Sequence, residues 1–299
     1  MIKNNWKKLG AVAFGLVALT FVGCSSKSAE EPKSADKTIG EQMDYKITGI
    51  DAGSGVVQAA EQAVKDYELD YTVQTSSGAA MTQALADAYK DEKPIIITGW
   101  SPHWMFSKYD LKYLDDPKGT FGEAEHINTI VRKGLKEDMP DAYKILDNFA
   151  WTPADSEAVM LKINAGEDAK ETARQWITDN KDTVSKWTEG ATKVDNKPIN
   201  IAYVAWDTEI ASTNVIGLVL EDMGYDVKLT QVDAGPMWAA VASGDADAIV
   251  AAWLPATHAK YMSDYKGKFE DLGPNLEGAK IGLVVPKYMD INSIEDLVK

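Results

Sequence analysis

Hydrophobic and polar positions follow the same order twice along this chain. The first stretch opens with a short apolar run and a glycine-rich turn, and continues with helical and then strand-like spacings. It predicts strand, turn, helix, strand, helix and strand over residues 46–50, 51–55, 56–67, 71–74, 78–89 and 94–100. Ser76 and Ser77 can cap the second of these helices.

The second stretch repeats this plan. It predicts strand, turn, helix, strand, helix and strand over residues 199–205, 206–208, 212–223, 225–232, 236–243 and 248–253. The spacings agree, because Gly49 precedes Trp100 by 51 residues and Ala202 precedes Trp253 by 51 residues. A further strand closes each stretch, at 126–132 and at 279–286. The chain therefore contains an internal repeat.

Strands that alternate with helices in this order predict an α/β fold of two lobes, with mainly parallel sheets, right-handed crossovers and a cleft between the lobes. Ligands of such sheets bind at the carboxyl ends of the strands, where Trp100 and Trp253 occupy matching places. Residues 152–192 have helical spacing and join the halves. We divide the chain into one module made of a first α/β half, a helical connector and a second α/β half, at 45–150, 151–195 and 196–299.

The N-terminus has the pattern of an export signal. Basic residues stand before an uncharged, mostly apolar stretch at 9–23, which is too short for a comfortable membrane span. Small residues then precede Cys24, and residues 24–44 are polar and predict a flexible tether. Residues 1–23 with Cys24 resemble a bacterial lipoprotein signal. The resemblance implies cleavage before Cys24, a diacylglycerol on its sulfur, and an anchor at the extracellular face of the cell membrane.

Composition and charge exclude several classes of protein. The chain has 299 residues, of which 45% are hydrophobic, so it can bury a large core. Its net charge is -15, and without the lysines of the signal it falls to about -18, which repels phosphate backbones and makes nucleic acid an unsuitable partner. After the signal, no stretch reaches 18 apolar residues. Cys24 is the single cysteine, so no internal disulfide can form.

The sequence contains few residues that could form a catalytic site. It has three histidines, no G-x-S-x-G or H-E-x-x-H motif, and no histidine or cysteine cluster with metal-ligand spacing. Asp51 and Asp207 each follow the first strand of a repeat, where we expect them to cap helices or orient loops. We expect no catalytic residues, no metal and no cofactor. An exported hydrolase remains a remote alternative.

Three tryptophans fall in loops that face the predicted cleft: Trp100, Trp206 and Trp253. A fully methylated ammonium has no N–H to donate, so a site selects it by size and by the negative faces of aromatic rings. Each ring contributes roughly 0.5–2 kcal/mol when water is excluded, so three rings contribute about 2–6 kcal/mol. Micromolar binding needs about 8 kcal/mol. The other tryptophans of the repeats and the connector are packing residues or undecided: Trp151, Trp176 and Trp187 are expected to pack, and Trp104 and Trp238 are undecided.

A negatively charged group of a ligand would need donors. The turn at 51–55 opens a helix, so its free N–H groups and the helix dipole form an anion site. His258 follows Trp253 by five residues and can donate an imidazole N–H to the same anion.

Four segments in order carry a resemblance to a known family: 49–55, 98–106, 202–207 and 252–258. They resemble the glycine betaine-binding proteins of compatible-solute ABC importers, the OpuAC type. The resemblance covers residues 45–299 and implies a type II periplasmic-binding-protein fold and a role in osmoprotection.

The resemblance also implies a site. An ammonium cage maps onto Trp100, Trp206 and Trp253, and carboxylate contacts map onto the backbone N–H groups of Gly55 and Val56 and onto His258. Ala52 stands where proline is frequent and Val56 where isoleucine is common, and neither change alters a backbone contact.

The sequence leaves three alternative ligands for the same site. Proline betaine shares both charged ends with glycine betaine, carnitine is longer, and choline lacks the carboxylate. The chain has no G-x-x-x-x-G-K-[ST] loop and no span after the signal, so the ABC permease and the ATPase must be other chains.

Overall fold

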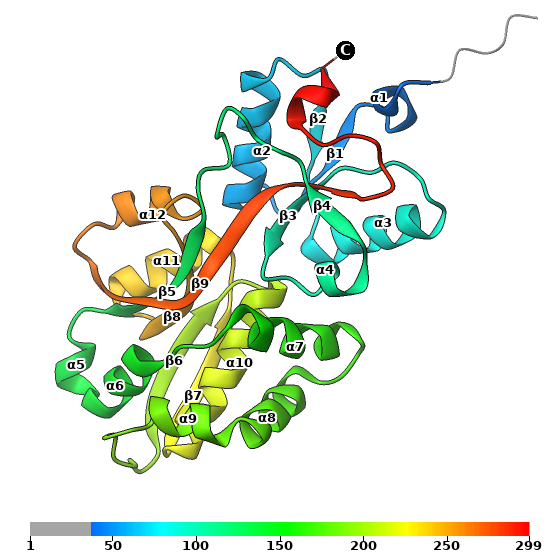
Figure 1. Cartoon of the computed structure of the whole chain (residues 1–299). Helices are drawn as coiled ribbons and strands as arrows, with labels where there is room; N and C mark the ends of the chain where they lie inside the picture. Colours follow the sequence, from blue (N-terminus) through cyan, green and yellow to red (C-terminus); the bar gives the residue numbers. More distant parts are fainter. Residues whose placement is uncertain (1–36, 299) are drawn as a thin grey trace, which may run out of the picture. The chain divides into compact units, whose positions relative to one another are not determined.

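The computed structural model describes residues 37–298, which fall within one compact unit (Figure 1). The predicted signal peptide, Cys24 and most of the predicted tether lie outside the described residues. The first repeat forms β1 (Lys46–Thr48), α2 (Gly55–Asp66), β2 (Thr72–Gln74), α3 (Gly78–Lys90) and β3 (Ile97–Ser101). Each of these elements lies close to its predicted range. Ser77 caps α3 as expected, since its side chain accepts the N–H of Ala80.

The second repeat forms β6 (Lys197–Tyr203), α10 (Asp207–Asp222), β7 (Tyr225–Gln231), α11 (Ala234–Ser243) and β8 (Ala248–Leu254). Helix α10 begins five residues before its predicted start, directly after Trp206. The polar residues of its first turn suggested a loop, because such residues are usually exposed. Here Thr208 and Glu209 are buried, since this turn faces the other lobe.

Two strands, β5 (Glu125–Arg132) and β9 (Phe269–Pro286), join the repeats because each pairs with strands of the other repeat. Strand β5 was expected to close the first repeat, but it pairs antiparallel with β8 of the second. The first part of β9 pairs with β5, and its second part pairs with β3 and β4 (Leu111–Tyr113). Sequence periodicity predicts that a strand exists but not which strand lies beside it, because pairing is decided by the fold.

Strand pairing defines two lobes that share β9. The first lobe contains residues 37–124 and 280–298, with strand order β2-β1-β3-β9-β4. The second contains residues 125–279, with strand order β7-β6-β8-β5-β9. The same order therefore occurs in both lobes. The lobes differ from the predicted sequence halves 45–150 and 196–299, because β5 and the end of β9 each lie in the opposite lobe.

Only part of the sheet is parallel. In each lobe the first three strands pair in parallel as predicted, β1 with β2 and β3, and β6 with β7 and β8. The crossing strands β5 and β9 pair antiparallel, because each returns from the other lobe. Parallel strands that end at one edge place the loops after β3, β6 and β8 at the boundary between the lobes.

The connector is helical as predicted. It contains α7 (Pro153–Asn164), α8 (Ala169–Asp179) and α9 (Lys181–Trp187), and Gly166 and Asn180 lie at helix ends. Trp151, Trp176 and Trp187 are buried and pack on one another, with the last two rings stacked 5.7 Å apart. Their predicted role in packing is confirmed.

The remaining helices are short: α1 (Ile39–Gln42), α4 (Met105–Lys108), α5 (Leu135–Asp138), α6 (Pro140–Asn148), α12 (Ala259–Asp264) and the 3₁₀ helix η1 (Ile294–Leu297). Helix α1 falls in the predicted flexible tether. A capping box at Thr38 and Glu41 stabilises it. The tether prediction is therefore wrong for these four residues.

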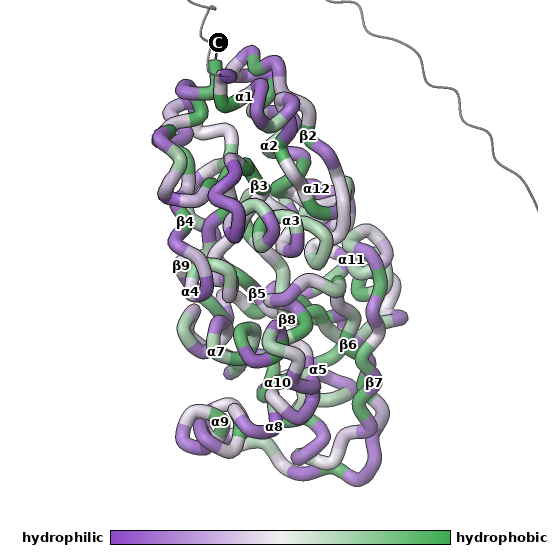
Figure 2. The backbone as a smooth tube through the Cα atoms, turned by 90° about the vertical axis from the view of Figure 1, so that its right-hand side faces the viewer, coloured by the Kyte–Doolittle hydropathy of each residue, from purple (hydrophilic) through white to green (hydrophobic). Residues whose placement is uncertain are grey.

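The core of the described chain follows the sheet. Every residue of β8 is buried, whereas hydrophobic and hydrophilic positions alternate along the outer helices (Figure 2). This is the pattern of helices that pack one face on a sheet. Among residues 37–298, no helix is both long and apolar enough to cross a membrane.

Candidate functional site

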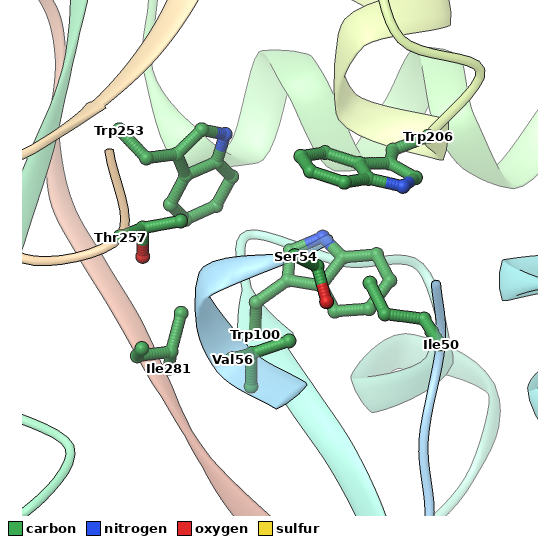
Figure 3. Close-up of a pocket in the computed structure, with 8 residues that line it drawn as sticks. All are labelled: Ile50, Ser54, Val56, Trp100, Trp206, Trp253, Thr257 and Ile281. Atoms are coloured by element: carbon green, nitrogen blue, oxygen red, sulfur yellow. The ribbon is translucent and has the colours of Figure 1, made fainter. Parts of the chain in front are cut away.

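The three tryptophans predicted to form a cage lie together at the boundary between the lobes. Trp100 is in β3 of the first lobe, whereas Trp206 precedes α10 and Trp253 is in β8 of the second lobe. The three indole rings surround one shared space, with Trp206 above, Trp100 below and Trp253 to the side in the view of Figure 3. Each of the three residues is at least 93% buried.

The rings line a small, apolar cavity that both lobes build. Its other lining residues are Ile50, Ser54, Val56, Thr257 and Ile281 (Figure 3). The volume of the cavity is about 20 Å³, far below the roughly 300–1,000 Å³ of small-molecule sites. In this form it has room for about one water molecule. A bound trimethylammonium therefore requires the three rings to lie farther apart than they do here.

The indole nitrogens are held by oxygen acceptors of the protein. Trp100 donates to Thr208 Oγ1 at 3.2 Å, Trp206 to Asp51 Oδ2 at 3.0 Å, and Trp253 to Glu209 Oε1 at 2.8 Å. Because each N–H is satisfied in this way, the ring faces remain available to the cavity. Ring faces carry the negative part of the aromatic quadrupole, which attracts cations.

One wall of the cavity is the N-terminus of α2. Ser54 precedes this helix but does not cap it, because its hydroxyl donates to the carbonyl of Asp51 at 2.7 Å. The first backbone N–H groups of the helix, at Gly55 and Val56, therefore receive no side-chain cap. Helix N-termini of this kind attract anions. Val56 lines the cavity together with the aromatic rings, and Gly55, the other predicted carboxylate donor, directly precedes it in the same helical turn.

Glycine at position 55 is required by a close approach between the lobes. A Cβ added at Gly55 would lie 2.5 Å from the carbonyl oxygen of Thr257 and 2.7 Å from its Cα. The loop that carries Thr257 is held by Glu125, whose carboxylate accepts the N–H groups of Ala256 and Thr257 at 2.8 and 2.7 Å. The second lobe thereby covers the start of α2.

His258 is a buried donor without a partner among the described residues. Its Nδ1 accepts the backbone N–H of Trp253 at 3.0 Å, so the hydrogen of the neutral ring lies on Nε2. Burial lowers the pKa of His258 to about 3, so the ring is neutral near pH 7. Nε2 is buried and makes no hydrogen bond. A buried donor in this state loses hydrogen-bond energy unless a ligand or water completes it.

Glu209 is a second buried titratable group at the site. It lies in the first turn of α10 and is 1% exposed. Burial raises the pKa of Glu209 to about 8, although the hydrogen bond from Trp253 opposes this shift. One carboxyl oxygen, Oε1, accepts from the indole, and the other, Oε2, has no partner among the described residues. The protonated, neutral form of the side chain is therefore favoured at pH 7.

Asp51 and Asp207 orient tryptophans and do not cap helices. Ser54 and Trp206 occupy the N-cap positions of α2 and α10, and neither helix has a side-chain cap. Asp207 accepts the indole N–H of Trp104 at 2.9 Å and lies 3.3 Å from Nε2 of His103. Burial by itself would raise the pKa of Asp207, but these hydrogen bonds lower it below its usual value.

The two undecided tryptophans have different surroundings. Trp104 is a contact between the lobes, through its bond to Asp207. Trp238 is fully buried and packs edge-on against His258, with 5.5 Å between the ring centroids. Neither lines the cavity with the three cage candidates.

Comparison with known proteins places this geometry in a family. Residues 27–179 and 197–299 match the OpuAC family model, described as the substrate binding domain of ABC-type glycine betaine transport systems. The chain belongs to this family. The resemblance carried by the four sequence motifs is thereby confirmed. The α/β fold with one strand order in both lobes is the type II periplasmic-binding-protein fold that this resemblance implied.

Named relatives of this OpuAC-family chain are transport binding proteins. The glycine betaine/carnitine transport binding protein GbuC of Listeria monocytogenes is 56% identical over 295 residues, which are 97% of this chain and 98% of GbuC. The glycine betaine/proline betaine-binding periplasmic protein of Escherichia coli is 27% identical over 38% of this chain and 37% of its own length. Lactococcal OpuAC, solved in a closed form with glycine betaine, aligns over 52% of this chain and 61% of its own, with 54% identity and a TM-score of 0.49.

Several residues of the site in this OpuAC-family chain were not predicted. Thr208 is predicted only as part of a turn, and Glu209 is given no role, although an acidic residue three positions after Trp206 and before an apolar helix is a visible signal. Thr257 and Ile281 gave no signal, because each reaches the cavity only through the crossing of β9 and the loop after β8.

Proposed function

We propose that this chain binds glycine betaine between its lobes as the extracytoplasmic solute-binding component of an ABC importer. The observation that supports this most directly is the convergence of three indole rings from two lobes on one apolar cavity. A quaternary ammonium has no N–H to donate, so hydrogen bonds cannot hold it. Cation–π attraction and the exclusion of water can hold it in this cavity. The rings of Trp100, Trp206 and Trp253 are the proposed cage.

The carboxylate of the ligand would bind at the start of α2. The backbone N–H groups of Gly55 and Val56 are its proposed donors, together with Nε2 of His258. These groups give the site a positive end without a charged side chain, since His258 is neutral. A zwitterion with its two charges a few bonds apart matches an aromatic cage next to a helix N-terminus.

The same proposed contacts predict how the affinities for other ligands compare with the affinity for glycine betaine. Choline lacks a carboxylate, so it would leave the His258 donor and the start of α2 unpaired, and we expect it to bind more weakly. Proline betaine keeps both charged groups and should bind comparably or more weakly. Carnitine is the second ligand in the name of GbuC, and its longer chain tests how far the cavity can adjust. An exported hydrolase has no support from the site.

The remaining assignments concern location and partners. We propose that residues 1–23 are a signal peptide and that Cys24 carries a lipid anchor at the extracellular face of the bacterial membrane. The loaded, closed form would deliver its ligand to a permease driven by an ATPase, both on other chains, for uptake of an osmoprotectant. The chain acts in this scheme as a binding protein and not as an enzyme.

Calorimetric competition tests the ligand assignment. Glycine betaine, proline betaine, carnitine and choline would be titrated into the purified chain at one salt concentration. Micromolar or tighter binding of glycine betaine, with choline at least tenfold weaker, is the expected result. Tighter binding of choline would contradict the carboxylate site, and absence of binding by all four would overturn the proposed function.

A further inference from the structure

Each lobe holds a cage tryptophan of the other lobe by its indole nitrogen. Trp206 belongs to the second lobe, and its acceptor Asp51 lies in the turn after β1 of the first lobe. Trp100 belongs to the first lobe, and its acceptor Thr208 lies in the first turn of α10 in the second lobe. The two bonds are 3.0 and 3.2 Å long and run in opposite directions across the boundary.

The third cage ring is held differently. Trp253 donates to Glu209, and both residues lie in the second lobe. Its orientation can therefore persist when the lobes separate, whereas separation removes the acceptors of Trp100 and Trp206. The cage thus contains one ring that is fixed within its lobe and two rings whose bonds require the opposite lobe.

We propose that Asp51 and Thr208 are positioning residues, each of which orients the cage tryptophan of the opposite lobe, so that the cage is completed only by closure. The inference rests on the proposed function of the site. A ligand would then meet a single oriented ring in an open protein and three in a closed one. Ring faces attract a cation only within about 6 Å of the centroid, so an unoriented indole contributes little. Closure and recognition of the ammonium are coupled by this arrangement.

A further contact between the lobes provides a matched comparison. Asp207 of the second lobe accepts the indole of Trp104 and lies beside His103, both of the first lobe. This contact also joins the lobes, but none of its three residues lines the cavity. Because His103 also packs edge-on against Trp100, with 4.5 Å between the ring centroids, a variant at Asp207 would disturb a cage ring. Trp104→Phe removes the indole bond to Asp207 and keeps the contact of Asp207 with His103, so it weakens closure without releasing a cage ring.

The test compares two ligands that share a carboxylate and differ in one methyl group. Glycine betaine offers a fully methylated ammonium to all three rings, whereas dimethylglycine has one N–H and depends less on a complete cage. Dissociation constants for both would be measured by calorimetry on wild type and on Asp51→Ala, Asp51→Asn, Thr208→Ala and Trp104→Phe. Thermal unfolding would confirm that each variant is folded.

The expected results differ between the variants. Asp51→Ala and Thr208→Ala should each weaken glycine betaine binding about tenfold, as expected for loss of one oriented ring, and should lower the preference for glycine betaine over dimethylglycine. Asp51→Asn keeps an acceptor oxygen and should restore most of that preference. Trp104→Phe should weaken binding of both ligands by the same factor and leave the preference unchanged.

Two results would overturn the inference. One is an unchanged preference in Asp51→Ala and Thr208→Ala, which would make both residues closure contacts only. The other is wild-type affinity in both variants. If wild type itself fails to bind glycine betaine, the proposed function fails, and this outcome is distinct because it precedes any effect of the variants. If Asp51→Ala does not fold, Thr208→Ala tests the same relation from the other lobe.

Discussion

Nδ1 of His258 accepts the backbone N–H of Trp253 at 3.0 Å, which ties the proposed carboxylate donor to the strand that carries a cage ring. The bond fixes the imidazole tautomer and leaves Nε2–H as a donor. One short segment, 253–258, therefore carries one proposed cage ring and one proposed anion donor, whereas the other proposed cage rings and donors belong to other segments.

Replacing Trp253 should weaken binding of glycine betaine. Loss of one ring removes roughly 0.5–2 kcal/mol of cation–π attraction together with apolar contact, so Trp253→Ala should raise the dissociation constant tenfold or more. Trp253→Phe keeps a ring face and should lose less. Trp151→Phe, which changes a packing ring outside the cavity, serves as control, and tryptophan fluorescence titration measures all three. Unchanged affinity in Trp253→Ala would remove this residue from the cage.

The affinity for glycine betaine should be constant between pH 5 and pH 7. The pKa of His258 is lowered to about 3 by burial, so its ring stays neutral and keeps its Nε2 donor across this range. The carboxyl of Glu209 also stays mostly protonated, since its pKa is raised to about 8. Calorimetry at both pH values should give dissociation constants within about twofold of each other. A loss of affinity centred near pH 6.5 would show that His258 titrates freely.

A methyl group at position 55 should obstruct closure over the ligand. In Gly55→Ala the new Cβ would meet the backbone of Thr257 at 2.5 Å, which is too close for either lobe to keep its place. We expect binding to weaken at least tenfold while each lobe remains folded, because alanine is well tolerated in a first helical turn. Gly53→Ala is the matched control, since no atom lies within 4 Å of its added Cβ. Equal affinity in the two variants would contradict the close approach.

Glu209 should make the stability of the protein fall as pH rises. Its pKa is about 8 in the folded state against an ordinary value of 4.5, so between these values the folded state keeps a proton that the unfolded state releases. The free energy of unfolding should therefore decrease with pH in this window, by up to about 1.4 kcal/mol per unit. Glu209→Gln does not titrate and should gain stability relative to wild type from pH 5 to pH 8. Urea unfolding at both pH values measures this difference, and parallel pH profiles would refute it.

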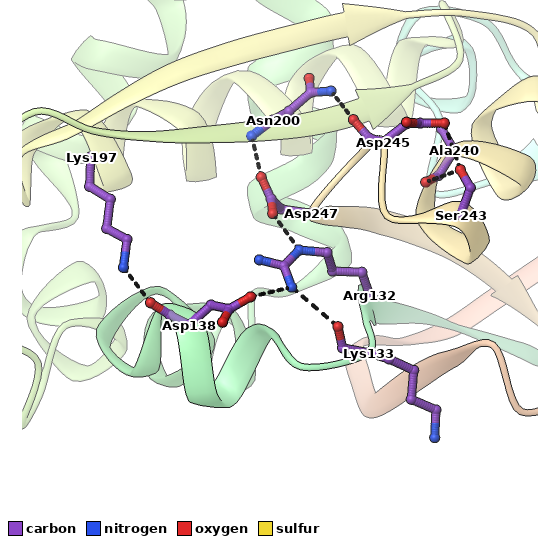
Figure 4. Close-up of polar contacts among 9 residues, drawn as sticks. All are labelled: Arg132, Lys133, Asp138, Lys197, Asn200, Ala240, Ser243, Asp245 and Asp247. Atoms are coloured by element: carbon purple, nitrogen blue, oxygen red, sulfur yellow. Dashed lines mark hydrogen bonds and ion pairs between the residues drawn. The ribbon is translucent and has the colours of Figure 1, made fainter.

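Arg132 should support the second lobe without affecting the ligand. It ends β5 and donates to Asp247 at 2.7 Å and to Asp138 at 2.9 Å, and Asp247 also accepts the N–H of Asn200 at 2.8 Å (Figure 4). The Arg132 and Asp247 side chains are only 16% and 15% exposed. Arg132→Ala should therefore lower the free energy of unfolding by about 3 kcal/mol.

The affinity of Arg132→Ala for glycine betaine should remain within twofold of wild type. Strand β5 places Arg132 about 23 Å from Glu125, which holds the loop at the cavity. Arg174→Ala is the comparison, because Arg174 pairs with Asp222 at the surface. This substitution should lower the free energy of unfolding by less than about 1 kcal/mol. Denaturant unfolding and calorimetry separate the two effects. A large loss of affinity in Arg132→Ala would show that the far end of β5 is coupled to the site.

Local patterns in the sequence determined the order of the elements and singled out the three cage candidates. Periodicity reports spacing along the chain directly. It therefore predicts the repeated order of strands and helices, the matching positions of Trp100 and Trp253, and the start of a helix at Val56, one residue after its start in the structure. The three tryptophans form a recognisable group because two of them end predicted strands and the third directly follows one.

The tertiary structure alone decided which residues meet across the lobes. The exchange of β5 and β9 brings Ile281 to the cavity and sets Thr257 against Gly55. It also pairs Trp206 with Asp51, which lies 155 positions earlier in the chain. Such contacts join segments distant in sequence, and pairing between them is set by the packing of the whole fold. A pattern read along the chain reports the spacing of neighbours, so it carries no information about which distant residue will face them.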